Sequence, residues 1–361
     1  MKIVTVGYLH GAGGAERQII LLSNQLAMRG HEVVLLILAD NLSSYTIASK
    51  VRVADLSVAE TGVSSSLGKI MKRLAAFRRF IKKEKPDLII NYNLQSAYFC
   101  LTLTKKQRGK VIYSERGDPY DAEYSGLLGK IRDYTVKRMD GLVFQSEGAR
   151  DFFSDEVKQK SIVIHNSVNV PQDKYPMPEV REKRIVKVGR LHPQKNQRLL
   201  IDAFSKIARP FSDYTLEIYG DGELHDELES QIKELGLINR VSLIPCRKDL
   251  WDCIYNASLF VLSSDFEGMP NALMEAMALG LPCISTDCRP GGARTLIDNG
   301  ENGFIVALGK ADDLAWTMSL CLSKKDVSER IALNARKIVQ THSEEAVFDK
   351  WTVFLNQITN S

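Results

Sequence analysis

The chain has 361 residues, which is too long for one ordinary hydrophobic core and predicts two domains of about 150 to 200 residues. Hydrophobic residues make up 44% of the sequence and charged residues 25%, as is typical of a soluble globular enzyme. No apolar run approaches the roughly 20 residues of a membrane-spanning helix, and no N-terminal export signal is visible. These features exclude an integral membrane protein and predict a cytoplasmic one.

The cysteine spacing and the distribution of charge limit the metal sites and partners that we expect. The six cysteines form no C-x-x-C pair and accompany no histidine cluster, so we expect reduced core cysteines and no structural zinc. The net charge of +4 is unevenly spread: residues 1–175 hold 26 basic and 18 acidic side chains, whereas the remainder holds 22 and 26. The first half is therefore the part that we expect to meet an anionic partner or surface.

Short β-rich runs alternate with amphipathic helical patterns along the chain. The strands predicted in the first half are 2–8, 31–38, 87–92, 110–115, 141–146 and 161–166. A polar, proline-containing stretch over 170–184 looks like a linker, and the alternation then restarts. The strands predicted after it are 184–190, 214–220, 240–245, 258–264, 282–287 and 303–306. Continuous apolar strands separated by helices predict parallel sheets covered on both faces, so we expect two doubly wound α/β domains, 1–170 and 171–341, facing each other across a cleft.

The first predicted strand leads into a glycine-rich turn, HGAGGAERQ at 10–18, which opens a helix. Glycines such as Gly13 and Gly14 let the backbone approach a phosphate closely, and a helix N-terminus offers N–H donors to it. A tight strand-to-helix turn without a ligand explains the same residues equally well. The G-x-G-x-x-G pattern of a dinucleotide-binding turn is absent, because Glu16 occupies the position of its third small residue.

A basic helix is predicted in the first half, over 66–87. Its apolar face is formed by Leu67, Ile70, Leu74, Phe77 and Ile81, and the rest of it by Lys69, Lys72, Arg73, Arg78, Arg79, Lys82 and Lys83. Two interpretations stay open. The helix covers the sheet and has a solvated basic face, or residues 66–85 also contact an anionic membrane surface or a lipid diphosphate, where each cation is worth ~1 kcal/mol.

Two cations begin the second predicted domain, in VGRLHPQKNQ at 188–197. Arg190 ends a predicted strand, and Lys195 lies in the loop or first helical turn beyond it. An arginine fork with a lysine beside it suits a diphosphate. An isolated pair of this spacing also fits a solvated basic loop, and only its place in the second domain favours the diphosphate.

Two glutamates stand eight positions apart in DFEGMPNALMEAMALG, residues 265–280. Glu267 precedes a predicted helix, where acids are favoured in any case. Glu275 lies within the helix among apolar and small residues, where a carboxylate is costly unless something binds it. The two adjacent hydroxyls of a ribose would satisfy its two oxygens; a neighbouring backbone group or arginine is the alternative.

Together these motifs resemble the retaining, GT-B-fold glycosyltransferases of family four, a large group that uses nucleotide sugars. The resemblance covers nearly the whole chain. It rests on GGAER (13–17), GRLHPQKN (189–196), GDGEL (220–224) and EGMPNALMEAMALGLPCIST (267–286) with its Glu-x7-Glu. A further motif, SERGDP (114–119), is common in the members that build bacterial surface polysaccharides and lipid-linked glycans. The resemblance implies the GT-B arrangement of two Rossmann-like domains, with a C-terminal helix near 342–358 that returns to the first.

The resemblance also implies a role for each candidate residue. The catalytic residues would be Arg190 and Lys195, which bind the diphosphate, and Glu267, which faces the donor sugar. The other residues implied to hold the donor are Gly13, Gly14, Gly268, Met269, Asn271 and the ribose-binding Glu275. Glu115 and Arg116 would lie on the acceptor side.

The function expected from these features is transfer of a hexose or N-acetylhexosamine from a UDP-linked donor to a lipid-linked or oligosaccharide acceptor in bacterial glycan assembly. We expect retention of configuration, no cofactor and no metal, because no D-x-D stands at a strand end, and no nucleic acid partner. One alternative is an NAD-dependent dehydrogenase, which would need the absent glycine pattern. The other is a non-enzymatic two-domain ligand-binding protein, which would need no cations and glutamates at strand ends.

Overall fold

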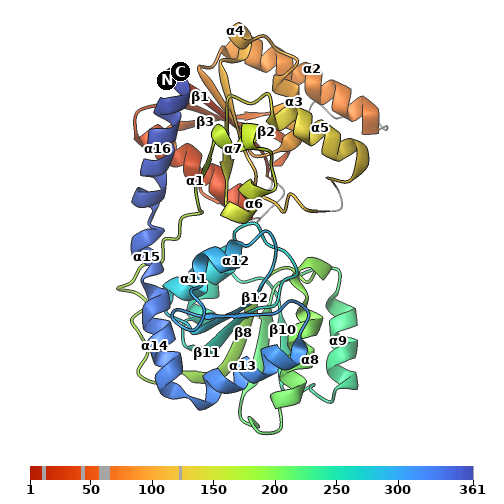
Figure 1. The fold of residues 1–361 in the computed structure, drawn as a ribbon, viewed down its shortest axis with the longest axis vertical. Helices are drawn as coiled ribbons and strands as arrows, with labels where there is room; N and C mark the ends of the chain where they lie inside the picture. The colour runs from red at the N-terminus through yellow and green to blue at the C-terminus, as the bar shows by residue number, and fades with distance from the viewer. Residues whose placement is uncertain (10–13, 42–44, 57–65, 122–123, 361) are drawn as a thin grey trace. The chain divides into compact units, whose positions relative to one another are not determined.

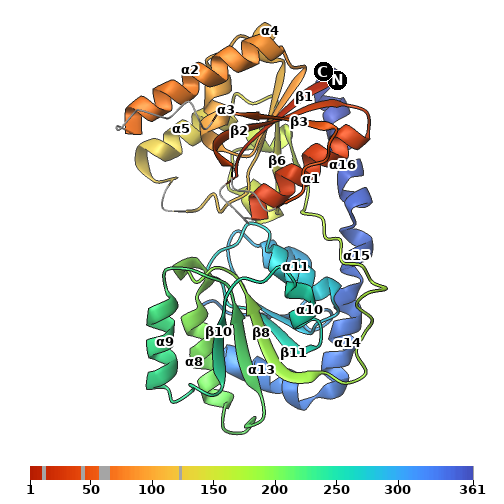
Figure 2. The same ribbon diagram turned by 180° about the vertical axis from the view of Figure 1, so that it is seen from behind.

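The computed structural model describes residues 1–9, 14–41, 45–56, 66–121 and 124–360. The chain divides into two compact units. Unit 1 comprises Met1–Asn166 and Val347–Ser361, and unit 2 comprises Ser167–Ala346. Each unit is a twisted sheet with helices on both of its faces (Figures 1 and 2). The prediction of two doubly wound parallel-sheet domains is confirmed.

The sheet of unit 1 has seven parallel strands in the order β3-β2-β1-β4-β5-β6-β7. Its strands are β1 Lys2–Leu9, β2 Glu32–Asn41, β3 Val51–Asp55, β4 Leu88–Asn91, β5 Lys110–Ser114, β6 Gly141–Phe144 and β7 Ser161–Val163. The strand β3 was not predicted from the sequence. This edge strand is short, and its residues are mostly exposed, so it lacks the apolar run that marked the other strands.

Helices cover both faces of this sheet. They are α1 Gly14–Met28, α2 Ser66–Glu84, α3 Leu94–Cys100, α4 Lys105–Arg108, α5 Gly126–Val136, α6 Glu147–Asp151, α7 Asp155–Gln159 and the C-terminal α16 Glu344–Asn360. Alternate strand residues point to opposite faces: Ile3 belongs to a hydrophobic cluster with α1 and α16, and Val4 belongs to one with α2 and α3. The apolar side of α16 thus completes the core of unit 1, and both chain ends lie beside each other there (Figure 1).

The sheet of unit 2 has six parallel strands in the order β10-β9-β8-β11-β12-β13. Its strands are β8 Glu182–Val188, β9 Thr215–Tyr219, β10 Val241–Ile244, β11 Ala257–Leu262, β12 Cys283–Thr286 and β13 Phe304–Val306. Its helices are the 3-10 turn η3 Pro193–Lys195, α8 Gln197–Ile207, α9 His225–Glu234, α10 Leu250–Ile254, α11 Asn271–Ala278, α12 Gly292–Leu296, α13 Ala311–Ser323, α14 Lys325–Arg336 and α15 Ile338–Thr341. β8 and β11 are paired at the centre of the sheet, so the loops that follow them leave side by side from its carboxyl edge.

The stretch that looked like a linker is packed against unit 2. Val170 and Tyr175 are buried in a hydrophobic cluster of this unit. The Arg336 guanidinium donates to the carbonyl oxygens of Gln172 at 3.1 Å and of Tyr175 at 2.7 Å. The expectation of a linker over 170–184 is therefore wrong for the residues that pack in this way. The stretch contains aromatic and aliphatic side chains among its polar residues, and these side chains are buried in the core of unit 2.

Helix α2 is only partly the sheet-covering helix that its spacing suggested. Phe77 and Ile81 are fully buried, as predicted. Leu67 and Ile70, expected on the same face, are 71% and 37% exposed, and Met71 is 57% exposed. The N-terminal half of α2 therefore presents apolar side chains together with its cations. Among the described residues, no helix combines the length and the apolarity needed to cross a bilayer.

Candidate functional site

Two loops at the carboxyl edge of the unit 2 sheet are joined by hydrogen bonds. The first follows β8 and contains η3; the second follows β11 and leads into α11. The Asp265 amide donates to the Gln194 carbonyl at 2.9 Å, and the Gln194 side chain donates to the Phe266 carbonyl at 2.8 Å. The Asn196 side chain also donates to the Asp265 carboxylate at 2.7 Å. These contacts bring together the two motifs that the sequence separates by about 70 residues.

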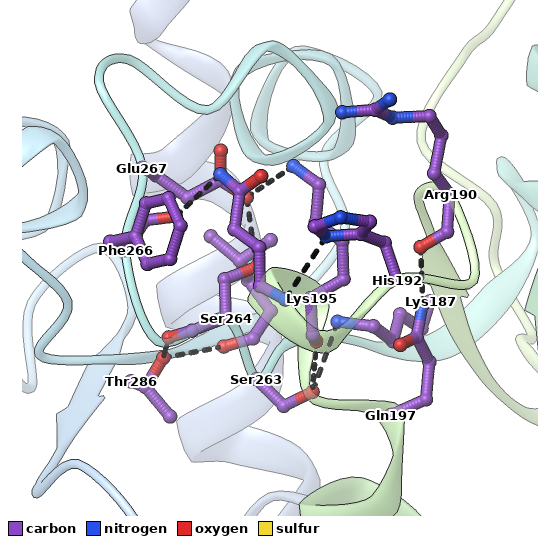
Figure 3. A network of polar contacts seen from close by, with 12 residues as sticks. Lys187, Arg190, His192, Lys195, Gln197, Ser263, Ser264, Phe266, Glu267 and Thr286 are labelled. Atoms are coloured by element: carbon purple, nitrogen blue, oxygen red, sulfur yellow. Dashed lines mark hydrogen bonds and ion pairs between the residues drawn. The ribbon is translucent and has the colours of Figure 1, made fainter. Parts of the chain in front are cut away.

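An ion pair occupies the centre of this arrangement (Figure 3). The Lys195 ammonium donates to Oε1 of Glu267 at 2.5 Å, and the Ser264 hydroxyl donates to the same oxygen at 2.8 Å. The side chains of Lys195 and Glu267 are 19% and 9% exposed. The pair is thus largely shielded from water, and each partner orients the other.

Arg190 is the exposed cation of the site. Its guanidinium makes no hydrogen bond or ion pair with any residue that the structure describes, and it extends to the same side as the Lys195 ammonium in Figure 3. Its backbone is held, since the Arg190 carbonyl accepts a hydrogen bond from the buried Gln197 side chain at 2.7 Å. A fixed backbone with an available guanidinium suits the binding of an anionic ligand.

A third loop, which follows β12, packs against the loop of Glu267. The Glu267 amide donates to the Arg289 carbonyl at 2.7 Å. A Cβ at Gly292 would lie 2.0 Å from the carbonyl oxygen of Gly268, so only glycine permits this approach. In helix α12, which follows this loop, Arg294 forms an ion pair with Asp287.

Glycines also explain the GDGEL motif. A Cβ at Gly220 would lie 2.2 Å from the carbonyl oxygen of Gly189, and one at Gly222 would lie 2.3 Å from that of Leu191. The glycines therefore let the loop after β9 pack directly on the backbone that carries Arg190.

The helix α11 follows the Glu267 loop directly. The amides of Gly268 and Met269, which precede its first residue Asn271, donate no hydrogen bond within the described chain. Glu275 is 9% exposed and lies among buried apolar residues of the same helix, as predicted. The residue is nevertheless not without an interaction partner in the chain.

In unit 1, Glu115 shapes a loop. Its Oε1 accepts hydrogen bonds from the amides of Arg116 and Gly117, both at 3.0 Å, and its Oε2 accepts one from the Tyr113 hydroxyl at 2.9 Å. Both carboxylate oxygens therefore accept hydrogen bonds, one from the SERGDP segment and one from the residue before it. The motif glutamate holds this loop in shape at the carboxyl end of β5.

Arg116 lies over an aromatic ring. Its guanidinium is 4.2 Å from the ring centroid of Tyr92 and donates to the Tyr92 hydroxyl at 2.7 Å and to the Asn166 side chain at 2.9 Å. Burial lowers the pKa of Arg116 from its ordinary value. Tyr92 and Asn166 were not found from the sequence, because they stand 24 and 50 residues from Arg116 and no spacing rule links them.

Two further predictions concern the glycine-rich turn and a metal. Gly13 lies outside the described residues, and Gly14 is exposed as the first residue of α1. Among the described residues, the exposed His225, Asp226 and Glu229 of α9 could bring three ligand atoms within 4.8 Å of one another. These exposed groups lie on α9 and not on the loops that form the candidate site. The expectation that the reaction needs no metal stays a prediction.

Comparison with known families decides the class of protein. Residues 12–172 match the family "Glycosyltransferase Family 4", and residues 173–338 match "Glycosyl transferases group 1". The chain belongs to glycosyltransferase family four. Both alternatives raised by the sequence, a dehydrogenase and a ligand-binding protein, are thereby set aside.

Relatives of this glycosyltransferase include named bacterial sugar transferases. It is 29% identical to the lipopolysaccharide 1,6-galactosyltransferase of Salmonella typhimurium, over 70% of each chain. It is 22% identical to the GalNAc-α-(1→4)-GalNAc-α-(1→3)-diNAcBac-PP-undecaprenol α-1,4-N-acetyl-D-galactosaminyltransferase of Campylobacter jejuni, over 100% of each chain. Among solved structures, HepE of Anabaena in complex with UDP and glucose is 21% identical, with a TM-score of 0.81 over 99% of this chain and 100% of that one. This likeness shows the fold, and the predicted GT-B class is confirmed.

Proposed function

We propose that this glycosyltransferase transfers a hexose or N-acetylhexosamine from a UDP-linked donor to a lipid-linked or oligosaccharide acceptor, with retention of configuration and without a metal. The observation that carries the proposal is the available Arg190 guanidinium beside the shielded Lys195–Glu267 pair at the carboxyl edge of the unit 2 sheet. UDP as the nucleotide is supported by its presence in the structurally similar HepE. A lipid-linked acceptor is supported by the name of the Campylobacter relative.

The donor would bind with its diphosphate against Arg190 and Lys195. The guanidinium offers a planar fork to two phosphate oxygens, and the ammonium adds a point charge. The amides of Gly268 and Met269, without acceptors in the described chain, would donate to the sugar hydroxyls or the phosphate at the start of α11. Glu275 would accept hydrogen bonds from the ribose diol, and Glu267 would turn its second oxygen to the sugar.

The reaction would proceed by attack from the face that the nucleotide leaves. The bond between the anomeric carbon and the diphosphate oxygen breaks, and the acceptor oxygen bonds to that carbon on the same face. The acceptor's proton passes to the departing phosphate oxygen. Arg190 and Lys195 stabilise the charge that develops on the diphosphate, which is the usual role of cations at a leaving phosphate.

The acceptor would bind in unit 1, where Arg116 is held by Tyr92 and Asn166. Helix α2 supports contact with an anionic membrane, because its exposed Leu67, Ile70 and Met71 accompany its cations. A surface cavity of about 440 Å³ on this helix is lined by Met71, Leu74, Ala75, Arg78, Arg79 and Lys82. The proposal places the enzyme in the cytoplasm, on the inner face of the membrane.

Nucleotide release from a panel of UDP- and GDP-sugars, measured with candidate acceptors, tests the donor assignment. Arg190→Ala and Lys195→Met should each lower kcat/KM at least about 100-fold, equivalent to about 2.7 kcal/mol of transition-state stabilisation. Arg198→Ala is the matched control, since its exposed pair with Glu227 is a surface pair outside the site. Wild-type rates in either of the first two variants would refute the diphosphate assignment.

Liposome flotation tests the membrane contact separately. Arg79→Glu/Lys82→Glu should abolish binding to vesicles that contain anionic lipid, whereas the matched reversals Lys233→Glu/Lys310→Glu in unit 2 should not. Binding of the wild type that does not depend on anionic lipid would leave α2 as a helix with a solvated basic face.

A further inference from the structure

Lys187 is a lysine buried in the interior of unit 2. It is the sixth residue of β8, a central strand of the sheet, and its side chain is fully buried. It points to the same face as Ile185, the face that α8 and α13 cover. A buried ammonium is costly, and an apolar side chain at this point would extend the core without that cost.

A chain of hydrogen bonds connects Lys187 with the candidate site (Figure 3). Its ammonium donates to the Ser263 hydroxyl at 3.0 Å, which is its one hydrogen bond within the described chain. The Ser263 hydroxyl lies 3.2 Å from the Lys195 carbonyl and 2.8 Å from the Asn196 carbonyl, and it donates to these oxygens. The chain therefore ends on the turn that presents the Lys195 ammonium.

The turn held in this way is conformationally unfavourable by itself. Asn196 has φ 42° and ψ 54°, in the left-handed region that non-glycine residues seldom adopt. Its side chain is occupied on both sides, accepting from the Leu199 amide and donating to Asp265. The Asn196 carbonyl also accepts a hydrogen bond from the Ser263 hydroxyl, which lies outside the loop. This contact adds a restraint that the loop itself does not supply.

The electrostatic surroundings of Lys187 belong to the same site. Burial, and after it the positive charge of Lys195, lower the pKa of Lys187 to about 7. Glu267, Cys288 and Asp265 act in the opposite direction. The N-terminus of α8, which begins at Gln197, adds to the unfavourable positive surroundings. An unfavourable charge with one hydrogen bond is the pattern of a group retained for function more than for stability.

We propose that Lys187 is a positioning residue of the donor site, which acts through the Ser263 hydroxyl to hold the Lys195–Asn196 turn and so aims the Lys195 ammonium at a nucleoside diphosphate. The inference rests on the proposed function for the identity of the ligand. The hydrogen-bond chain itself does not depend on it.

The test measures UDP affinity by calorimetry and melting temperature for the full chain and its variants. Lys187→Met should lower UDP affinity about tenfold while the melting temperature stays equal or rises, because the buried charge is removed. Ser263→Ala should lower affinity by a similar factor and also lower the melting temperature, since it leaves the Lys187 ammonium without its partner. The double variant should bind UDP no more weakly than either single variant, because both act through one chain of contacts.

A chemically matched control lies in unit 1. Ser23 is also a buried serine, whose hydroxyl contacts a side chain, that of Thr5 at 2.7 Å, and a carbonyl, that of Ile19 at 2.7 Å. Ser23→Ala should lower the melting temperature and leave UDP affinity unchanged. Additive losses of affinity in the Lys187→Met/Ser263→Ala double variant, or unchanged affinity in Lys187→Met, would overturn the proposal.

Hydrogen exchange separates this inference from the proposed function. The amides of Lys195 and Asn196 donate within the turn, to the carbonyls of His192 at 2.9 Å and Pro193 at 3.0 Å. These two amides should exchange at least about tenfold faster in Lys187→Met than in the wild type, without a change in global stability that would account for it. A wild type that binds no nucleoside diphosphate would refute the proposed function, and unchanged exchange at the two amides would refute the positioning role.

Discussion

Replacing Gly292 by alanine should damage the candidate donor site through one methyl group. The added Cβ would lie 2.0 Å from the carbonyl oxygen of Gly268 and 3.1 Å from Cδ of Pro270. Real Cβ atoms essentially never come closer than 3.0 Å to such a neighbour, so one of the two loops must move by about 1 Å. The obstacle is backbone, and no rotamer change relieves it.

The size of the effect follows from what that backbone carries. Overpacking of this kind costs about 1–3 kcal/mol of folding free energy. The Gly268 carbonyl directly follows Glu267, whose amide bonds the Arg289 carbonyl at 2.7 Å, so displacement disturbs the Lys195–Glu267 pair as well. A 1 Å misplacement of a reacting group lowers the rate about 100-fold. The kcat/KM of Gly292→Ala should therefore fall even under conditions in which the variant is fully folded.

The assay combines urea unfolding with sugar-transfer kinetics at a temperature where the variant is fully folded. Gly117→Ala in unit 1 is the control, because among the described residues a Cβ there would meet only a side-chain oxygen of Glu115, at an ordinary 3.6 Å. It should change stability by less than about 0.5 kcal/mol. A Gly292→Ala enzyme with wild-type unfolding free energy and wild-type kcat/KM would show that the tight packing of the two loops is unimportant.

Three further predictions concern charge and ligand contacts. The fold lowers the pKa of Lys187 from 10.5 to about 7, so the unfolded chain binds more protons between these pH values, and the free energy of unfolding should rise with pH there by up to ~1.4 kcal/mol per pH unit. Urea unfolding at pH 7, 8 and 9 should show this slope reduced in Lys187→Met; equal slopes would contradict it. Glu275→Gln should weaken UDP binding by about 1.5–3 kcal/mol in calorimetry, because the ribose hydroxyls lose a charged acceptor, and unchanged affinity would remove the ribose assignment. Arg116→Lys should raise the KM for acceptor with the UDP affinity intact, since lysine cannot both lie over Tyr92 and bond Asn166 as the guanidinium does; the reverse pattern would place Arg116 outside the acceptor site.

The local pattern of the sequence was enough to predict both sheets. Buried parallel strands are continuous apolar runs, and the amphipathic helices between them repeat every 3.6 residues, so both signals are contained in short windows. The close backbone approach of the GDGEL glycines, by contrast, became visible only in the structure. β3 was missed because an exposed edge strand has no such run.

Only the tertiary structure decided which side chains act together. The Lys195–Glu267 pair joins residues 72 positions apart, and the Lys187–Ser263 bond joins residues 76 apart. Their contact depends on the pairing of β8 with β11, which no local pattern encodes. The same limit applies to Glu115: its motif did not reveal that both its oxygens accept hydrogen bonds that hold its own loop, and its place on the acceptor side stays a prediction. The sequence by itself determined the residue types that a glycosyltransferase needs and the strands that carry them. Their roles depend on long-range packing, because the energy and the orientation of a buried charged side chain are set by the partners that the fold brings to it.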